Sequence, residues 1–403
     1  EVLVVLGAGA MEQGDVAEAE SLYHRGLEVC REIGYRHGEG VNLVDLGNVL
    51  YVQGRVGQAL RRYEEATDVF EASRHRRGRA TVLANAASVR HTVVGDDERA
   101  GREAREALSY FKDIGDPTRV AQCLDTLAGI EKRSGRMEEA RRHLVASIGE
   151  LDTAEHRWFE AQHWRSLALL EVEVGDTDDA LESLDRADLI CSEAGLTNLA
   201  VELASIRGVV LLARGDVDTA LDTAARAVEG LRPGVERPYL VHFRHHQALH
   251  ALGRGDEARE ALEAAHFRLH AALAGLTEEE RDQALALPEH RAIEAAWTGL
   301  QPRRILVWLP EASAPTGRPL RGEEWREVHW TVEDPADEEI TDRGQRRRYR
   351  LLRLLEEAGA QRASPTVDHL ADVLGVSSST VRRDLAALRD EGRAVHTRGT
   401  RTA

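Results

Sequence analysis

The residues best suited to metal chemistry are four histidines in one predicted helix, His242, His245, His246 and His250. Three of them, His242, His246 and His250, recur at every fourth position, so a helix places them on one face, where imidazoles could bind a transition metal. No cysteine is near, so any further ligand would be a carboxylate from a neighbouring helix. The spacing equally fits packing histidines on a polar helix surface, and we predict no metal and no other cofactor.

Motifs for catalysis are missing from the sequence. The only lysines, Lys112 and Lys132, do not follow a glycine, so there is no GxxxxGK[ST] phosphate loop. Gly7-Ala-Gly9 imitates a dinucleotide fingerprint, but Glu12 occupies the place of the third glycine. We find no Ser/His/Asp, HExxH or paired-carboxylate arrangement. The sequence therefore predicts a binding protein rather than an enzyme.

Charge is unevenly distributed over the 403 residues, whose net charge is −17. Residues 341–403 hold thirteen arginines and eight acidic residues, a net charge of +5, which leaves −22 on residues 1–340. Nucleic acid would repel the acidic body and attract the basic tail. The sequence thus assigns any nucleic-acid contact to its last sixty residues.

The cysteines and apolar stretches indicate the compartment. Cys30, Cys123 and Cys191 are too far apart in sequence for a CxxC metal knuckle and suit a reduced, cytosolic environment. The longest apolar stretch, Val2 to Met11, is too short to span a bilayer and has no basic segment before it. We expect a cytoplasmic protein without a membrane partner.

Self-similarity dominates the first three hundred residues. A glycine followed by Asp or Arg recurs at spacings of 40, 41, 40, 40 and 40 residues, and a seventh follows. These glycines are Gly14, Gly54, Gly95, Gly135, Gly175, Gly215 and Gly253. Five residues after each comes an alanine, and helix-period segments flank each glycine. Each unit is therefore predicted to be a helix, a glycine turn and a second helix that packs closely on the first.

This pattern resembles the tetratricopeptide repeat in a form of about forty residues. The second unit carries the motif at Leu43, Leu46, Gly47, Leu50, Gly54, Ala59, Tyr63 and Ala66. The array is also similar to the repeat arms of bacterial STAND-type ATPases and MalT-like regulators, with Leu287 to Trp297 resembling their closing helix; the ATPase module of those proteins is absent. The resemblance implies a superhelix of about seven helical hairpins with a long concave binding face.

The first helix of each unit is expected to line that concave face. Amides and mixed charges along such a groove suit a peptide, a protein segment or a polar small molecule as effector, and the alternative is that they are only a solvated helix surface. The nominated residues are Asn48, Tyr51, Asn85, Gln122, Asp125, Gln162, Arg165, Glu202 and Ser205.

Composition changes at Gln301. Arg304–Pro310 and Trp325–Val332 alternate apolar and polar residues like two strands, and Glu333–Glu339 is acidic. Trp308, Trp325 and Trp330 fall here. We predict a small β-containing joint packed by these rings, followed by an exposed acidic linker. The expected domains are a repeat array at 1–300, this joint and linker at 301–340, and a third domain at 341–403.

The third domain is predicted to be a helix-turn-helix. Arg346–Glu357, Ser364–Leu374 and Ser378–Leu388 form three helices, with Gly375 in the turn and Ser377 as cap of the last. Residues 392–401 suggest a strand and a basic wing. Leu370-Ala, Leu374-Gly-Val-Ser and Thr380-Val-Arg-Arg-Asp-Leu closely resemble the DeoR-type winged helix.

That resemblance implies DNA contacts by the third helix, the wing and the first helix. The residues that match are Ser378, Ser379, Thr380, Arg382, Arg383, Arg398, Arg401, Arg346, Arg347 and Arg348. The fold class expected is thus mainly α: a tetratricopeptide superhelix, a β-containing joint and a C-terminal winged helix-turn-helix. The function expected is a transcription regulator that binds double-stranded DNA, as a homodimer, under control of an effector in the repeat groove. The alternative is a non-enzymatic protein-interaction scaffold, such as a fragment of a STAND-type sensor, whose winged helix binds protein.

Overall fold

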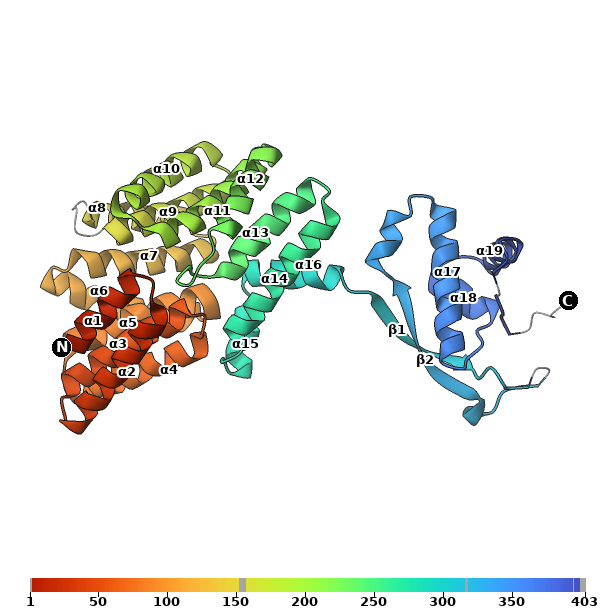
Figure 1. The fold of residues 1–403 in the computed structure, drawn as a ribbon, viewed down its shortest axis with the longest axis horizontal. Helices are drawn as coiled ribbons and strands as arrows, with labels where there is room; N and C mark the ends of the chain where they lie inside the picture. Colours follow the sequence, from red (N-terminus) through yellow and green to blue (C-terminus); the bar gives the residue numbers. More distant parts are fainter. Residues whose placement is uncertain (1, 152–156, 316–317, 394, 399–403) are drawn as a thin grey trace. The chain divides into compact units, whose positions relative to one another are not determined.

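The computed structural model describes residues 2–151, 157–315, 318–393 and 395–398. The chain divides into two compact units, Glu1–Glu294 and Ala295–Ala403, and its elements are mostly helices (Figure 1). Among the described helices, none combines the length and the apolar character that crossing a membrane requires.

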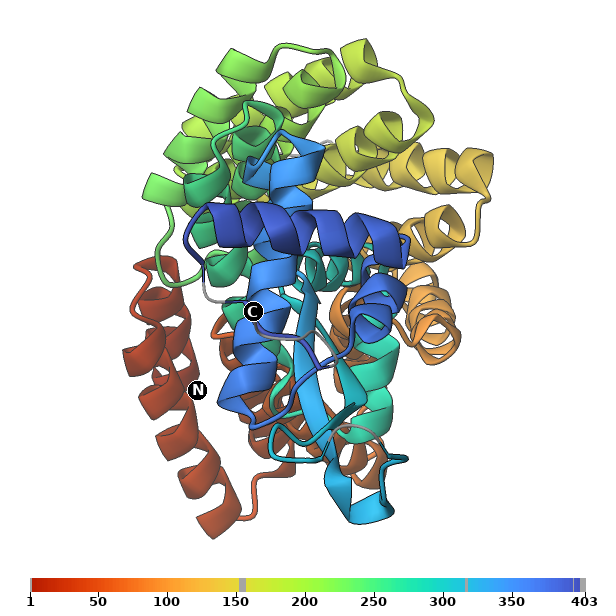
Figure 2. The same ribbon diagram turned by 90° about the vertical axis from the view of Figure 1, so that its right-hand side faces the viewer.

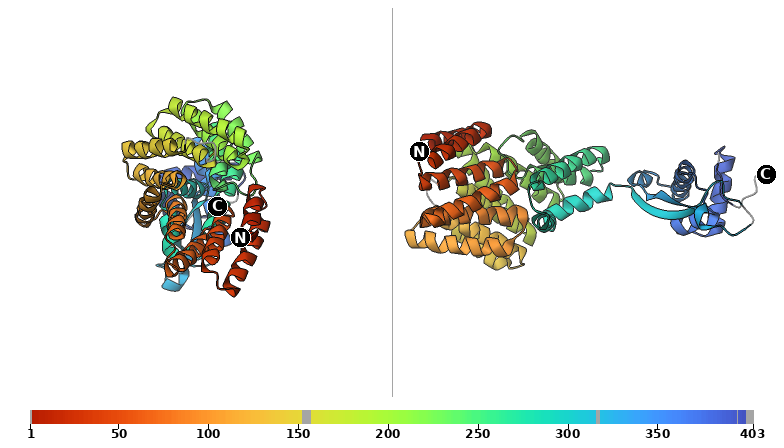
Figure 3. Two further views of the ribbon diagram at one scale, coloured as in Figure 1. Left: turned by 90° about the vertical axis from the view of Figure 1, so that its left-hand side faces the viewer. Right: turned by 90° about the horizontal axis from the view of Figure 1, so that it is seen from below.

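Seven antiparallel helical hairpins build the described part of the first unit, as the repeat predicted. They are α1 (Val2–Glu12) with α2 (Val16–Glu32), α3 (Arg36–Val52) with α4 (Val56–Ala72), α5 (Arg76–Val89) with α6 (Asp97–Ile114), α7 (Pro117–Arg133) with α8 (Met137–Glu150), α9 (Arg157–Val174) with α10 (Thr177–Ala194), α11 (Thr197–Ala213) with α12 (Val217–Glu229), and α13 (Pro238–Ala251) with α14 (Gly255–Leu273). Two shorter helices follow, α15 (Glu278–Leu285) and α16 (Pro288–Gly299). Figure 3 shows the hairpins stacked in chain order.

The turn glycines adopt the backbone conformation that the repeat requires. Gly54 between α3 and α4 has φ +75°, in the left-handed region that side chains disfavour. Five residues later the fully buried Ala59 lets the two helices approach. The prediction of a glycine turn and a close-packed alanine is confirmed.

The one repeat with 41 residues carries its extra residue in a π-helical turn. Residues Arg90–Val94 (η1) continue α5 with wider turns and end at Gly95, whose φ is +84°. A single-residue insertion into a helix is commonly accommodated as a π-bulge, and such bulges are frequent at functional sites. Thr92, within this turn, lines the cavity described below.

The end of the array contacts the second hairpin. Gly275, after α14, lies so close to Gly57 of α4 that a Cβ on Gly57 would be 2.0 Å from the Gly275 carbonyl oxygen. The same carbonyl accepts a 3.2 Å hydrogen bond from Nη1 of Arg61. The first unit is therefore closed across its superhelical turn.

The second unit, over its described residues, is a two-stranded antiparallel sheet packed on three helices. The strands are β1 (Arg303–Pro310) and β2 (Trp325–Glu333), and the helices are α17 (Arg343–Ala360), α18 (Val367–Leu374) and α19 (Ser378–Asp390), which cross one another in Figure 2. Short 3₁₀ turns lie at Gly322–Glu324 (η3) and Pro335–Glu339 (η4). Trp330 is fully buried in the common core and donates a 2.8 Å hydrogen bond from Nε1 to the Leu354 carbonyl.

Three expectations for this unit need correction. The acidic segment after β2 is not an exposed linker, because Asp337 is fully buried and pairs with Arg350 and Arg353 of α17. Trp308 does not pack the joint, since it is 58% exposed. Of the predicted wing, residues 392–393 and 395–398 form no strand, and residues 394 and 399–401 lie outside the described part of the chain. The predicted joint and helices instead share one hydrophobic core.

Helix α18 begins later than predicted. Pro365 restricts the residue before it to extended backbone, and Thr366 caps the helix by accepting a hydrogen bond from His369 N. The predicted turn and cap are confirmed: Gly375 has φ +63°, and the Ser377 side chain accepts from Thr380 N.

Candidate effector cavity and nucleic-acid interface

The first helices of the repeats enclose a cavity of about 330 Å³ on the concave side of the array. Its walls come from α3, α5, α7 and α9, with contributions from η1 and from the loop before α13. Seven of the nine nominated groove residues line it: Asn48, Tyr51, Asn85, Gln122, Asp125, Gln162 and Arg165. The structure thus brings these side chains to one place, while their contact with a ligand stays a prediction.

An amide ladder runs across three repeats on the cavity wall. The Asn85 side-chain amide donates to Asn48 Oδ1 at 3.1 Å, and Gln122 Nε2 donates to Asn85 Oδ1 at 3.0 Å. Tyr63 donates its hydroxyl to Asn48 Oδ1, and Arg119 donates to Gln122 Oε1, both at 2.8 Å. These bonds hold the amides in fixed orientations, so the wall is preorganised rather than mobile.

Other side chains that line the cavity carry unsatisfied polar atoms. Asp125 Oδ1, Gln162 Oε1, Arg165 Nε and Arg237 Nε are buried and have no hydrogen-bond partner within the described part of the chain. Nδ1 of His163 is in the same condition. Buried polar groups in proteins are nearly always bonded, so each exception needs a reason. A polar ligand in the cavity would explain these exceptions, because it could bond the two acceptors and the two cationic donors.

Glu202 and Ser205 lie beneath the cavity lining. Arg165 Nη1 donates to Glu202 Oε2 at 2.6 Å, and both side chains are about 9% exposed. Burial raises the pKa of Glu202, and the adjacent arginine opposes that rise. Ser205 accepts a 2.8 Å hydrogen bond from Arg244. These two nominated residues therefore position the arginines instead of facing the cavity.

Sequence reasoning missed the loop between α12 and α13. Glu236 of this loop accepts a 3.1 Å hydrogen bond from the Tyr51 hydroxyl of α3, and its backbone N–H donates to Glu202 Oε1 at 3.1 Å. Arg237 has φ +45° and lines the cavity. The only signal in the sequence was the repeat length, because Gly215 and Gly253 are 38 residues apart.

An aromatic pair completes the lining. Trp158 and Phe159 meet edge to face with ring centroids 4.9 Å apart, and Trp158 is 42% exposed. Together with the amides and arginines, the cavity can receive a ligand that carries carbonyl or carboxylate oxygens, N–H groups and an apolar side chain.

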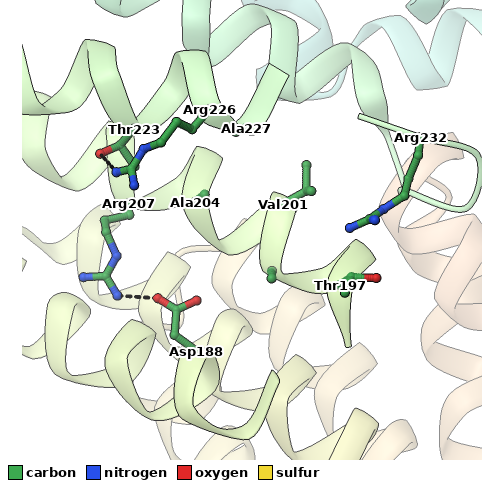
Figure 4. Close-up of a pocket in the computed structure, with 10 residues that line it drawn as sticks. Asp188, Thr197, Val201, Ala204, Arg207, Thr223, Arg226, Ala227 and Arg232 are labelled. Carbon is green, nitrogen blue, oxygen red and sulfur yellow. Dashed lines mark hydrogen bonds and ion pairs between the residues drawn. The ribbon is translucent and has the colours of Figure 1, made fainter. Parts of the chain in front are cut away.

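A second cavity of about 430 Å³ lies between α10, α11 and α12 (Figure 4). Two of its three arginines are engaged: Arg207 donates to Asp188 at 2.6 Å, and Arg226 donates to the Thr223 hydroxyl at 3.5 Å. Small aliphatic groups such as Ala204 also line the cavity. Because none of its lining side chains carries a buried polar atom without a partner in the described residues, this cavity is a weaker candidate for a polar ligand.

The histidine face of α13 takes part in packing. Nδ1 of the buried His246 is 2.8 Å from the Ala258 carbonyl, and its ring stacks on Phe243. Burial and the nearby Arg268 lower the pKa of His242 to about 4. Among the described residues, the group with metal-ligand geometry is instead His266, His270 and Glu294, whose ligand atoms lie within 4.8 Å of one another. The spacing of His266 and His270 was visible in the sequence, but Glu294 comes from another helix.

The recognition helix α19 exposes the two arginines predicted to contact DNA. Arg382 and Arg383 are exposed, and the described residues provide no ion pair for either. Ser379 is also exposed, and its hydroxyl lies 2.8 Å from that of Ser377. Ser378 donates to Asp368 of α18 at 2.7 Å, which fixes the two helices of the motif. Thr380 lies in the same first turn, half-buried.

Several other predicted DNA contacts serve the fold. Arg347 forms a bidentate pair with the buried Asp384, at 2.5 and 3.1 Å. Arg398 donates to the Ala314 and Pro315 carbonyls. These contacts engage both guanidinium groups within the unit, and their contact with phosphates stays a prediction.

The remaining basic residues are less constrained. Arg346 Nε donates to the Ile340 carbonyl at 2.8 Å. Arg348 Nε is 3.7 Å from Glu391 Oε1, a long surface pair. Arg401 lies outside the described residues. Of the predicted DNA contacts in the described residues, Arg382 and Arg383 of α19 are thus the exposed arginines without an ion pair.

Comparison with protein families agrees with both units. Residues 1–72 match a tetratricopeptide repeat family, and residues 201–226 and 247–264 match a second tetratricopeptide repeat family. Residues 347–402 match the DeoR-like helix-turn-helix domain. The chain therefore contains tetratricopeptide repeats and a C-terminal DeoR-like helix-turn-helix domain. No curated protein sequence matches it. The likeness to STAND-type and MalT-like arms stays a prediction.

Solved structures resemble the repeat array in fold. A crystal structure of a Rap protein complexed with Competence and Sporulation Factor has a TM-score of 0.52 at 16% identity, covering 74% of this chain and 97% of that one. The apo form of RapI has a TM-score of 0.51 at 12% identity, covering 68% and 98%. At such identities the likeness concerns the fold alone.

Proposed function

We propose that the chain is a cytoplasmic, DNA-binding transcription regulator whose repeat cavity binds a peptide-like effector. The proposal of DNA binding rests on a contrast within the helix-turn-helix domain. Arg347 forms an ion pair with Asp384, whereas Arg382 and Arg383 are exposed on α19. A helix that offers exposed arginines in its N-terminal half has the composition that reads guanine edges and phosphates in a major groove.

Selection of bound duplexes from a random DNA pool tests this half. The full chain should enrich a motif, and the variant Arg382→Ala/Arg383→Ala should fail to enrich it. The control Arg25→Ala/Arg186→Ala removes two exposed arginines from the repeat array and should leave the enrichment intact. The log–log slope of affinity against salt should become shallower by about 0.9 for each phosphate that the variant no longer neutralises. Absence of enrichment, even at low salt, would overturn DNA binding and favour a protein-interaction scaffold.

The effector half rests on the unsatisfied atoms of the cavity. Arg165 Nε and Arg237 Nε call for oxygen acceptors, whereas Asp125 Oδ1 and Gln162 Oε1 call for N–H donors. A peptide or amino-acid derivative offers both types within one backbone. The exposed Trp158 ring beside Phe159 suits an apolar side chain. The similarity of the array to a Rap protein that was crystallised with Competence and Sporulation Factor supports ligand binding by the array.

A displayed library of short random peptides tests the effector class. Enriched peptides should bind the full chain and bind at least about tenfold more weakly to Asp125→Ala or Gln162→Ala, because each substitution removes a bonded acceptor. Arg226→Ala in the second cavity is the matched control and should have no effect. Peptides that bind equally well to all three variants would contradict the proposal.

Regulation would couple the two halves. An effector that favours one curvature of the array changes operator affinity only if it binds the two states differently. We propose a homodimer that reads two half-sites, since one winged helix buries a small interface. Equal operator affinity with and without an enriched peptide would refute the coupling while leaving both binding activities standing.

A further inference from the structure

The free edge of the small sheet in the second unit has a self-complementary arrangement. Residues Ile305 and Val307 of β1 point inward and pack on the core, whereas Arg304, Leu306 and Trp308 point outward. Leu306 is 50% exposed and Trp308 58% exposed. A tryptophan, a leucine and an arginine on alternate positions of an edge strand form an unusual solvent face, because edge strands normally carry features that prevent pairing.

The two edges of the sheet differ in whether side chains bond their backbone groups. On the β2 edge, the backbone N–H of His329 donates to Gln361 Oε1 at 2.9 Å, and that of Thr331 donates to Glu357 Oε2 at 2.7 Å. Gln361 Nε2 also donates to the His329 carbonyl. Side chains from α17 and the residue after it thus satisfy this edge and block it against another strand.

From Arg304 to Trp308 the β1 edge carries the matching groups without such a cover. Beyond Trp308 the edge is occupied, because Ser364 N donates to the Pro310 carbonyl at 2.9 Å and Glu311 pairs with Ala363. Leu306 is opposite His329 and Arg304 is opposite Thr331 in the register. Because the N–H groups of His329 and Thr331 face away from β1, these are the non-hydrogen-bonded pairs of the ladder. The backbone groups of Arg304 and Leu306, and by alternation those of Trp308, therefore face the open edge. Over the described residues of this unit, no backbone partner for them is present.

We infer that β1 pairs with β1 of a second copy, antiparallel, about a two-fold axis at Leu306. In that register Leu306 faces its own copy, and Arg304 faces Trp308 of the second chain on both sides of the axis. The guanidinium then lies against the indole, a favourable cation–π arrangement, and the three outward residues of each chain form about six backbone hydrogen bonds. A register displaced by two residues would leave both arginines or both tryptophans without a partner. The two sheets become one four-stranded sheet.

A cysteine at the axis is the most direct test. Residues in a hydrogen-bonded antiparallel pair have Cα atoms about 5.5 Å apart, within the range that a disulfide bridges. Leu306→Cys should form an intermolecular disulfide under mild oxidation, and the native cysteines do not interfere because all three are buried. Leu189→Cys, on α10 with a similar exposure of 55%, is the control and should stay monomeric on a non-reducing gel. Equal cross-linking of the two variants, or none at Leu306→Cys, would overturn the inference.

Equilibrium sedimentation of the full chain without DNA gives the second test. The wild-type chain should dimerise, and Leu306→Pro should weaken the dimer at least tenfold, because it removes an outward N–H while sparing the bonds to β2. An unchanged far-ultraviolet circular dichroism spectrum and melting temperature would establish that this variant folds. A monomeric wild-type chain, or a dimer indifferent to Leu306→Pro, would refute the interface. The inference rests on the proposed homodimer, but its tests use no DNA, so failure here is distinguishable from failure to bind an operator.

Discussion

The buried ion pair between Arg165 of α9 and Glu202 of α11 offers a quantitative test of how the cavity is held. The two side chains are about 9% exposed and 2.6 Å apart. Glu202 also accepts the backbone N–H of Glu236. Glu202→Ala leaves a buried guanidinium without its anion and a loop N–H without its acceptor. Removing one partner of a buried pair typically costs about 3–5 kcal/mol, and we expect a decrease of that size in the free energy of unfolding.

A double-mutant cycle in urea isolates the pair. Arg165→Met, Glu202→Ala and the double variant are compared with the wild-type chain, and the coupling energy should exceed about 1.5 kcal/mol. The surface pair Arg62–Glu65, at 2.8 Å but with side chains 32% and 42% exposed, is the control and should couple by about 0.3–0.5 kcal/mol. Glu202→Ala should also raise hydrogen exchange in the loop at Glu236. A coupling no larger than that of Arg62–Glu65 would show that Arg165 is solvated and that the cavity is not held in this way.

Three further changes are expected to affect stability. Trp330→Ala should destabilise the second unit by about 3–5 kcal/mol in calorimetry, because a fully buried ring is removed; a cost below about 1 kcal/mol would contradict its place in the core. Burial raises the pKa of Asp45 to about 7, so the folded chain binds more protons than the unfolded chain between about pH 4 and pH 7. Stability should fall as pH rises through that window, and Asp45→Asn should reduce the fall; a pH profile unchanged by the substitution would refute this. Gly54→Ala should cost about 1 kcal/mol in thermal unfolding through its positive φ alone; a neutral result would mean that the turn adapts.

Much of the fold was predictable because the same sequence signals recur in all seven hairpins. A left-handed glycine and a buried alanine recur in each hairpin, so any one weak signal is reinforced by the others. The helix-turn-helix was equally local, since Gly375 and Ser377 specify its turn and cap by themselves. Such features depend on neighbours in sequence, which are visible without coordinates.

The charged residues that were misjudged contact residues distant in the sequence. Asp337 is in an acidic run that suggests a solvated linker, yet Arg350 and Arg353 withdraw it from solvent. Similarly, Asp384 forms an ion pair with Arg347, which is 37 residues away in the sequence. Charge patterning predicts where charges are, but not which of them will neutralise one another on packing.

Only part of the candidate cavity could be predicted from the sequence, because some of its residues are brought together by contacts between distant segments. The repeat register nominated Asn48 and Gln162 for the concave face, and the structure places both in the cavity lining. The repeat register could not predict the positions of Glu236 and Arg237. They belong to an irregular loop, which is held by hydrogen bonds to Tyr51 and Glu202. Which of the lining polar atoms remain unsatisfied is likewise a property of the assembled wall, not of any segment.

The closure at Gly57 and Gly275 has a consequence for how this chain can evolve. In an open solenoid, repeats can be duplicated or deleted because each touches only its neighbours. Here the carbonyl of Gly275 packs against Gly57, a position that leaves no room for a side chain, and Arg61 donates a hydrogen bond to the same carbonyl. Adding or deleting a hairpin between Gly57 and Gly275 would move that carbonyl away from Gly57 and break the closure. We therefore expect natural variation between α4 and α14 to consist of substitutions rather than of changes in the number of hairpins.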